Sequence, residues 1–241
     1  MDKLLDKILI AHGGIERWNM FKTTSATIRF GGLAFASKFN KKGLRSRRFH
    51  ISTKRPEVIV EEFPKHGQRG IFTADLVRIE TQDGITIKER KNPRYAFKNI
   101  RRNFWWDDLD LLYFCGYAIW NYLNSPFLLT QDGIQIRDSG FWNENGEVWK
   151  KLEAIFPDDF PTHCKKQVFY FDSNNQMRRL DYDPEVFASW AKAAHYCSDL
   201  NFFSGLLFPT KRKVVPRTMS GRSKPKPLLV WIEVKDVQLL T

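Results

Sequence analysis

The feature of this sequence that most constrains its fold is a helix-length segment that is apolar around its whole circumference. Asp107 or Asp108 can cap a helix that runs to about Asn124, where Ser125-Pro126 ends it. Its large apolar residues are Leu109, Leu111, Leu112, Tyr113, Phe114, Tyr117, Ile119, Trp120 and Tyr122. Because a surface helix keeps a polar face, this helix has to be covered on several faces, and we expect it inside a curved β-sheet.

The rest of the chain supplies the strands of that sheet. Residues 2–20 have the apolar spacing of a helix interrupted at Gly13-Gly14, and short β-forming runs follow after Thr23. The predicted strands are Thr27–Phe39, Phe49–Thr53, Val58–Phe63, Leu76–Thr81, Ile85–Arg90, Ile134–Asp138, Val148–Phe156, Val168–Asp172, Met177–Tyr182, Ala193–Asp199, Leu206–Pro216 and Leu228–Leu239.

Short strands at such regular spacing predict one antiparallel sheet rather than two domains. The expected fold class is mainly β (α+β). We expect a single strongly curved sheet, a half-barrel, wrapped around the N-terminal helix and the internal aromatic-rich helix. One domain then covers residues 1–241.

Turn residues mark the connections between these strands. The stretch Arg217–Pro227 is rich in Ser, Lys and Pro and predicts an exposed loop between the last two strands. Residue pairs that favour the positive-φ positions of tight hairpins are Asp83-Gly84, Asp132-Gly133, Asn145-Gly146 and Asn174-Asn175.

Length and composition exclude several classes of protein. The longest apolar run, Leu111–Trp120, is roughly half of a membrane span. The chain begins Met-Asp-Lys-Leu-Leu-Asp-Lys, with acids where an export signal carries bases. The three cysteines, Cys115, Cys164 and Cys197, form an odd and scattered set. We therefore expect a cytoplasmic protein without a transmembrane segment or a disulfide framework.

An N-terminal helix that contains His12-Gly13-Gly14 and Trp18 leads into a first strand, and Gly205–Arg212 later carries a Gly-x-x-Phe-Pro-Thr signature. Together these residues resemble the LolA-like superfamily of half-barrel proteins, which includes bacterial lipoprotein carriers. The resemblance implies a strongly curved antiparallel sheet around one or more helices, with a hydrophobic cavity between them.

Further segments resemble a group of uncharacterised cytosolic bacterial proteins with the same architecture. These segments are Phe114–Tyr122, Asp181-Tyr182 and Trp190–Tyr196. A half-barrel enzyme that rearranges an indole intermediate without a cofactor is a precedent for catalysis on this architecture.

His195 is the strongest single candidate for a catalytic residue. In an extended strand it shares a face with Ala193, while Ala194 and Tyr196 point to the other face. Small alanines beside a group that titrates near neutral pH leave room for a ligand. We expect His195 to move a proton, with Glu153 or Tyr196 assisting. A hydrogen-bonded structural histidine is the alternative.

Arginines and aromatic side chains are the candidate ligand contacts. Arg94 and Arg137 can each hold a ligand carboxylate through a bidentate guanidinium contact, and exposed arginines are the alternative. Flat rings suit a planar aromatic or polyunsaturated ligand, although most rings serve the core. The aromatic candidates are Trp105, Tyr117, Trp120, Trp142 and Trp190.

No motif points to a metal or a cofactor. The chain has no Walker loop, no Rossmann glycine fingerprint and no Gly-x-Ser-x-Gly motif. His163-Cys164 and His195-x-Cys197 offer soft ligands, but a zinc site needs four in tetrahedral geometry, and no paired spacing supports one. We expect neither a metal nor a cofactor.

The positive charge is concentrated in two segments without acids. The net charge is +12, Lys38–Arg55 carries eight bases, and Lys211–Lys226 carries seven. Such strips can bind nucleic acid or an anionic membrane surface. Because no nucleic-acid-binding motif is present, we interpret them as a solvated rim and do not expect a nucleic-acid partner.

The sequence therefore predicts binding of a hydrophobic or aromatic small molecule in the half-barrel cavity. Cofactor-independent cyclisation, isomerisation or decarboxylation in a biosynthetic pathway is the first expectation. The alternative is a non-catalytic carrier of a lipid-like ligand. A basic nucleic-acid or membrane-surface adaptor is the third hypothesis, and the oligomeric state stays open.

Overall fold

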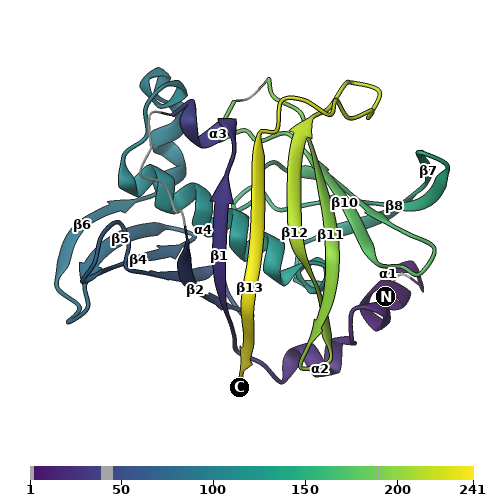
Figure 1. Cartoon of the computed structure of the whole chain (residues 1–241), viewed down its shortest axis with the longest axis horizontal. Coiled ribbons are helices and arrows are strands. Elements are labelled where there is room, and N and C mark those ends of the chain that lie inside the picture. The colour runs from purple at the N-terminus through teal and green to yellow at the C-terminus, as the bar shows by residue number, and fades with distance from the viewer. Residues whose placement is uncertain (1–2, 39–45, 189) are drawn as a thin grey trace.

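A computed structural model describes residues 3–38, 46–188 and 190–241 and contains one antiparallel sheet (Figure 1). Its thirteen strands are β1 (Thr23–Gly31), β2 (Arg47–Ser52), β3 (Glu57–Glu61), β4 (Gln68–Thr73), β5 (Leu76–Thr81), β6 (Thr86–Lys91), β7 (Gln135–Glu144), β8 (Glu147–Ile155), β9 (Lys166–Phe171), β10 (Met177–Tyr182), β11 (Ala193–Phe203), β12 (Leu206–Pro216) and β13 (Val230–Leu240). Across the sheet they run β6-β5-β4-β3-β2-β1-β13-β12-β11-β10-β9-β8-β7. The sheet is thus two meanders, β1–β6 and β7–β13, joined where β1 pairs with β13.

Short helices and one long helix accompany the sheet. They are α1 (Lys3–Ala11), α2 (Ile15–Asn19), α3 (Leu33–Ala36), η1 (Pro93–Lys98), η2 (Ile100–Asn103), α4 (Asp108–Asn124) and η3 (Phe127–Thr130). In the described part of the chain, no helix combines the length and the apolar character needed to cross a membrane.

The long helix α4 has the bounds that the sequence predicts, and it is buried over sixteen consecutive residues. Asp107 caps it: the Asp107 carboxylate accepts a hydrogen bond from the Asp110 N–H at 2.8 Å, and the Asp110 carboxylate accepts one from the Asp107 N–H at 3.0 Å. The helix packs against β2–β6. Gly116 permits this close approach, because a Cβ there would lie 2.4 Å from the ring of Phe72.

The N-terminal helix is interrupted at the predicted glycine pair and forms α1 and α2. Gly13 adopts φ +106°, and a Cβ at this position would lie 2.2 Å from the Gly205 carbonyl oxygen. The neighbouring His12 is fully buried; its Nδ1 donates to the Ile8 carbonyl at 2.8 Å, and its Nε2 accepts from the Met177 N–H at 3.3 Å. These contacts attach the N-terminal helices to β10 and to the β11–β12 hairpin, beside which Figure 1 shows them.

The mainly β class and the antiparallel sheet with an internal helix are confirmed, but the sheet is open and not strongly curled. Its edge strands β6 and β7 lie on opposite sides of the molecule in Figure 1. The physical reason is that two sets of elements share the covering of the inner face. α4 packs chiefly on β2–β6, while His12, directly after α1, and His163 of the 156–164 segment contact β10. The sheet therefore need not wrap around one helix, and the single-domain organisation stays a prediction.

Two local expectations need correction. The predicted strand Thr27–Phe39 ends at Gly31 and is followed by α3, while Phe39 lies outside the described residues. Strand β4 was not predicted, because its central Gly70 weakens a strand pattern. The structure explains this glycine: a Cβ there would lie 2.7 Å from the side chain of Leu112 in α4.

Candidate functional site

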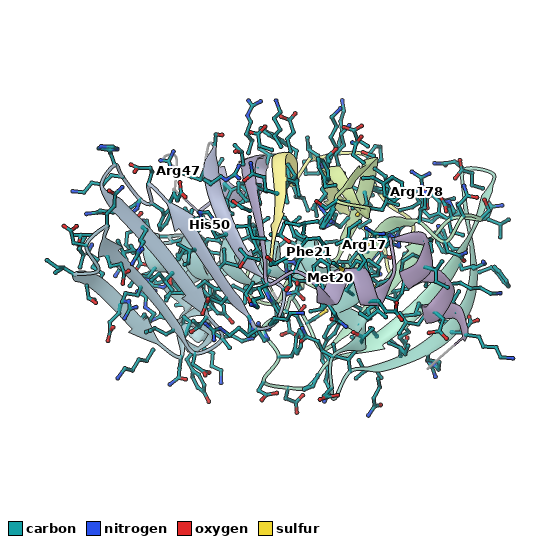
Figure 2. The ribbon with its side chains drawn as sticks, turned by 90° about the horizontal axis from the view of Figure 1, so that it is seen from below. Arg17, Met20, Phe21, Arg47, His50 and Arg178 are labelled. Carbon is teal, nitrogen blue, oxygen red and sulfur yellow. The ribbon has the colours of Figure 1, made fainter. Side chains whose placement is uncertain are left out.

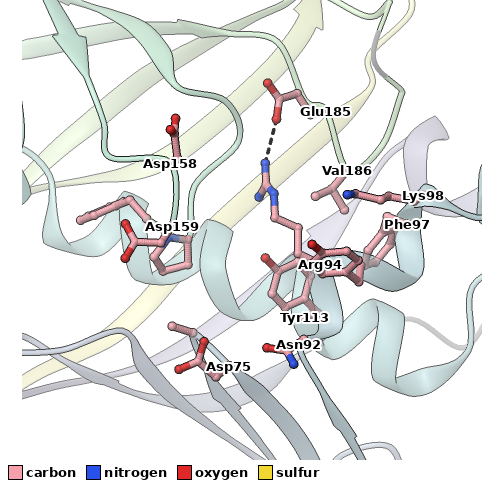
Figure 3. A pocket seen from close by; sticks show the side chains of 14 residues that line it. Asp75, Asn92, Arg94, Phe97, Lys98, Tyr113, Asp158, Asp159, Glu185 and Val186 are labelled. Atoms are coloured by element: carbon pink, nitrogen blue, oxygen red, sulfur yellow. Dashed lines mark hydrogen bonds and ion pairs between the residues drawn. The ribbon is translucent and has the colours of Figure 1, made fainter.

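A pocket of about 460 Å³ opens beside α4 (Figure 3). The β4–β5 turn and η1 form one wall, and the turns at residues 158–161 and 185–186 form the other. Tyr113 contributes the side chain from α4. The pocket thus lies where α4, η1 and the turns after β8 and β10 meet.

Arg94 extends from η1 to the opposite wall of this pocket. Its Nη1 donates to the Thr162 carbonyl at 2.7 Å, and its Nη2 donates to the Glu185 carboxylate at 2.9 Å and to the His163 carbonyl at 3.4 Å. The structure therefore places Arg94 in a pocket, as a ligand contact requires. Its guanidinium already has a carboxylate partner, so Arg94 also holds the two walls together.

The pKa values of both Tyr113 and Arg94 are raised in this pocket. Burial raises the pKa of the Tyr113 phenol, although Arg94 opposes this. Burial acts to lower the pKa of Arg94, but the phenols of Tyr117 and Tyr113 and the Glu185 carboxylate raise it on balance. At neutral pH the pocket therefore presents a charged guanidinium next to a neutral phenol.

The remaining lining combines apolar side chains with charges of both signs. Phe97, Phe160 and Val186 provide apolar contacts. The charged lining residues are Arg94, Lys98, Asp75, Asp158, Asp159 and Glu185. Such a lining suits a small molecule with an apolar body and a neutral or zwitterionic polar end.

Beyond Tyr113, buried phenols and imidazoles form a continuous hydrogen-bond network. The Tyr117 hydroxyl bonds to His163 Nδ1 at 3.1 Å, and the Tyr122 hydroxyl bonds to His163 Nε2 at 2.6 Å and to the Tyr182 hydroxyl at 2.9 Å. The His163 and Tyr182 rings stack with centroids 3.8 Å apart. Burial, with the Arg94 charge nearby, lowers the pKa of His163 to about 3, so this imidazole is neutral.

His195 lies at the end of this network and is fully buried. Its Nδ1 is 3.4 Å from the Tyr182 hydroxyl, and its Nε2 is 3.4 Å from Nη1 of Arg212. Burial, with the charge of Arg212 adding to it, lowers the pKa of His195 well below its usual value. The side chain does not line the pocket of Arg94. Its surroundings are those of a hydrogen-bonded structural histidine, and its catalytic role stays a prediction.

Tyr196 faces the other side of the sheet from His195, because neighbouring residues of β11 alternate. Its hydroxyl donates to the Glu144 carboxylate at 2.7 Å and lies 2.7 Å from the Ser223 hydroxyl. Arg179 Nη1 donates to it at 3.3 Å. The structure therefore does not bring Tyr196 and His195 together.

Glu153 and Arg137 are partners of each other across β8 and β7. Arg137 Nη2 lies 2.7 Å from the Glu153 carboxylate, and Lys166 Nζ lies 2.5 Å from its second oxygen. The hydrogen bond from Lys166, assisted by Arg137, holds the pKa of Glu153 below its usual value. Neither residue lies in the pocket of Arg94 or beside His195.

The aromatic candidates do not surround one cavity. Trp120 and Tyr117 are fully buried in α4, and Trp142 borders a separate polar hollow near the 220–223 segment. The side chains of Trp105 and Trp190 are 38% and 84% exposed. The aromatic candidates do not include the rings that line the pocket, which are Tyr95, Phe97, Tyr113 and Phe160. In the sequence, Tyr95 and Phe97 lie close to Arg94, and Phe160 lies in the acidic turn Pro-Asp-Asp-Phe-Pro at 157–161.

The two soft-ligand pairs have other partners. The Cys164 thiol donates to the Lys166 carbonyl at 3.0 Å, and Cys197 Sγ accepts from Arg212 Nη1 at 3.2 Å. Burial raises the pKa of both thiols. Within residues 3–38, 46–188 and 190–241, no three His, Cys, Asp or Glu side chains gather as a metal would require.

The fold matches solved bacterial structures over nearly the whole chain. A LolA superfamily protein from Nitrosomonas europaea matches with a TM-score of 0.52 and 13% identity, over 97% of this chain and 92% of that one. A DUF1329 family protein from Desulfovibrio piger matches with a TM-score of 0.54 and 10% identity, over 98% of this chain and 91% of that one. A candidate outer membrane lipoprotein-sorting protein domain from Vibrio parahaemolyticus matches with a TM-score of 0.52 and 12% identity, over 99% of this chain and 92% of that one.

These likenesses establish the fold. No protein-family model matches the sequence, and no curated protein matches it. The chain therefore has the fold of LolA superfamily and DUF1329 proteins, and the resemblance indicated by its sequence motifs is confirmed at that level.

Proposed function

We propose that this protein is a non-catalytic carrier of a hydrophobic, lipid-like small molecule, bound with its polar end in the pocket of Arg94. The observation that carries the proposal is that pocket, whose volume of about 460 Å³ is within the range of small-molecule sites. The fold shared with LolA superfamily proteins supports the same reading.

The lining supports an amphipathic ligand. The rings of Phe97 and Tyr113 lie 5.7 Å apart and offer apolar contacts at the side of α4. Arg94 and Glu185 offer a fixed donor and acceptor pair at the opposite wall. A ligand with a neutral or zwitterionic polar end meets both without leaving either charge unpaired.

Cofactor-independent catalysis stays a prediction. Its proposed groups do not converge: His195 is buried on one face of β11, Tyr196 lies on the other, and Glu153 is paired with Arg137 and Lys166. A cytoplasmic location also stays a prediction. The carrier reading needs no reacting group, only a pocket that binds and releases its ligand.

The test is binding of methyl cis-parinarate, the uncharged methyl ester of a fluorescent polyene fatty acid, combined with native mass spectrometry of the purified protein. We expect a co-purified small molecule and saturable binding of methyl parinarate. Ala74 lines the pocket, so Ala74→Trp should fill it and weaken binding by at least about tenfold, a loss of about 1.4 kcal/mol.

The matched control is Ala36→Trp, which adds the same side chain at an exposed position of α3 outside the pocket. The control should bind like the wild type. Equal binding by Ala74→Trp would contradict the assignment of the pocket. Recovery of methyl parinarate or of the co-purified molecule in chemically altered form would contradict the carrier function and favour catalysis.

A further inference from the structure

Large apolar side chains are exposed together in the segment that precedes α4. Tyr95, Ile100, Phe104 and Trp105, which we call the aromatic platform, are 70%, 76%, 65% and 38% exposed. Soluble proteins rarely expose such side chains in one cluster unless the cluster contacts a partner or a membrane.

Cations alternate with these side chains. Lys98 Nζ lies 4.1 Å from the ring centroid of Tyr95, and the Arg101 guanidinium carbon lies 4.6 Å from that of Trp105. The sequence from Arg90 to Trp106 contains six bases and no acid. The platform is therefore both apolar and positively charged, although acids line the adjoining pocket.

The platform lies at one end of the molecule, together with other exposed apolar and basic residues. Figure 1 shows η1 and η2, α3 and the 217–227 loop at its upper end. Leu33 of α3, Trp190 and Met219 are 55%, 84% and 83% exposed. The 217–227 loop adds four bases and no acid. These segments therefore reach the same end of the molecule as the aromatic platform.

The platform is held in place from beneath. Lys38 is buried, and its Nζ donates to the carbonyls of Asn103 at 2.7 Å and Phe187 at 3.1 Å. Arg102 forms ion pairs with Asp110 at 2.8 Å and Asp107 at 3.4 Å at the start of α4. These contacts fix η2 to the core, so the exposed side chains stand on a supported surface.

We propose that this end of the molecule docks on an anionic lipid bilayer, with the aromatic platform inserted at the headgroup level. Aromatic and aliphatic side chains enter the boundary between headgroups and acyl chains, while Lys and Arg stay among anionic headgroups. Ile100, Leu33 and Met219 favour lipid over single-stranded nucleic acid, because aliphatic side chains offer no ring face on which bases stack. Lys98 and Tyr95 also line the pocket of Arg94, so the docked end is next to the pocket opening.

The test is cosedimentation of the full chain with vesicles of phosphatidylcholine, alone or mixed with phosphatidylglycerol. We expect binding to the mixed vesicles that weakens as salt is raised. Ile100→Ser with Phe104→Ser should weaken it by at least about tenfold for each side chain removed. Arg101→Gln with Lys224→Gln should weaken it by about 25-fold, at about fivefold for each charge.

Matched controls lie at the other end and on the sheet. Met20 and Phe202 are each 63% exposed, and Figure 2 views the molecule from the end that carries Met20. Met20→Ser with Phe202→Ser, and the exposed pair Lys7→Gln with Lys235→Gln, should bind vesicles like the wild type. Binding of methyl parinarate by all four double variants separates docking from the carrier function, because none of the substituted residues lines the pocket.

Insertion is tested with brominated acyl chains, which quench tryptophan fluorescence only at close range. Vesicles carrying them should quench the wild type, and Trp105→Phe with Trp190→Phe should remove most of that added quenching, because both exposed tryptophans lie at the docked end. Wild-type binding by the Ile100→Ser, Phe104→Ser variant would overturn the proposal. So would binding to single-stranded DNA or to a protein partner without binding to anionic vesicles.

Discussion

Two fully buried arginines, Arg179 of β10 and Arg212 of β12, occupy opposite faces of the same sheet. The register shows this directly: Arg179 pairs with Tyr196 of β11, whereas Arg212 pairs with Cys197. Each site buries one guanidinium group, but the two groups have different partners. The charge of Arg179 is balanced by carboxylates, whereas Arg212 has neutral acceptors.

Arg179 is surrounded by groups that compensate its charge. It forms ion pairs with Asp181 at 2.7 Å and Glu144 at 2.9 Å and donates to the Gly221 carbonyl. The rings of Trp142, Tyr170 and Tyr196 lie around its guanidinium, at 5.4, 4.9 and 5.3 Å. The 217–223 loop thus closes over a cluster in which charges and hydrogen bonds are matched.

Arg212 has no carboxylate partner among the described residues. Its Nη2 donates to the Tyr122 carbonyl at 2.7 Å, and its Nη1 reaches Cys197 Sγ at 3.2 Å and His195 Nε2 at 3.4 Å. In the described part of the chain its Nε is buried without a hydrogen-bond partner. Neutral acceptors stabilise a buried cation less than carboxylates do, so this charge raises the cost of folding on the inner face.

Removing the compensated arginine should have the largest effect. Arg179→Met leaves the buried Asp181 with only Arg217, at 3.4 Å, as a cation and removes the ion pair of the partly exposed Glu144, so we expect a loss of about 3–5 kcal/mol in the free energy of unfolding. Urea denaturation measures it. Arg29→Met is the control: Arg29 pairs with Glu233 at 3.1 Å, the two side chains are 48% and 36% exposed, and we expect a loss of about 0–1 kcal/mol. Equal losses in both variants would show that Arg179 does not hold its cluster together.

The hydrogen-bond network of His163 with Tyr117 and Tyr122 should give the next largest effect on stability, as a dependence on pH. The pKa of His163 is lowered from 6.5 to about 3, so between these values the unfolded chain binds a proton that the folded chain does not. The free energy of unfolding should therefore fall, as pH falls below 6.5, by up to about 1.4 kcal/mol per pH unit from this residue. His163→Phe should lower stability but remove that contribution from the slope.

Urea denaturation of the wild type and His163→Phe across this pH range measures the difference in slope. His66→Phe is the control, because the His66 side chain is 97% exposed and solvent surrounds it in both states. A wild-type slope in His163→Phe would mean that His163 takes up its proton in the folded protein.

The smallest effect is expected at Arg212. Arg212→Met removes an unbalanced buried charge but leaves the Tyr122 carbonyl without its donor, so the two changes should offset each other to within about 1 kcal/mol. Urea denaturation beside Arg179→Met gives the comparison directly. A loss as large as that of Arg179→Met would reveal an anionic partner of Arg212 on the inner face.

Local signals predicted most of the elements. The cap at Asp107, the stop at Ser125-Pro126 and the break at Gly13-Gly14 depend on neighbouring residues, and all three are confirmed. Each predicted turn pair likewise contains a residue with positive φ, as Asp83-Gly84 does at Gly84, with φ +86°. Strand β4 and the curvature of the sheet depend on how α4 packs, and no short stretch of sequence encodes that.

The candidate site was less predictable, because it is made by residues distant in sequence. Arg94 was selected, but its partners Thr162 and Glu185 come from turns about seventy and ninety residues later. Strand alternation already separates Tyr196 from His195 in the sequence, and the structure confirms that the two side chains lie on opposite faces of β11. The sequence indicates which side chains can do chemistry, whereas the register decides which of them meet.

The pairing of β1 with β13 has a consequence for how the molecule is made. Of the thirteen strands, β13 is the last to leave the ribosome, yet it fills the centre of the sheet between β1 and β12. Each meander can form from contacts between successive strands during synthesis, whereas the seam must wait for Val230–Leu240. Until then β1 and β12 are both unpaired edges, so the nascent chain is most exposed to misassociation before β13 has paired with them.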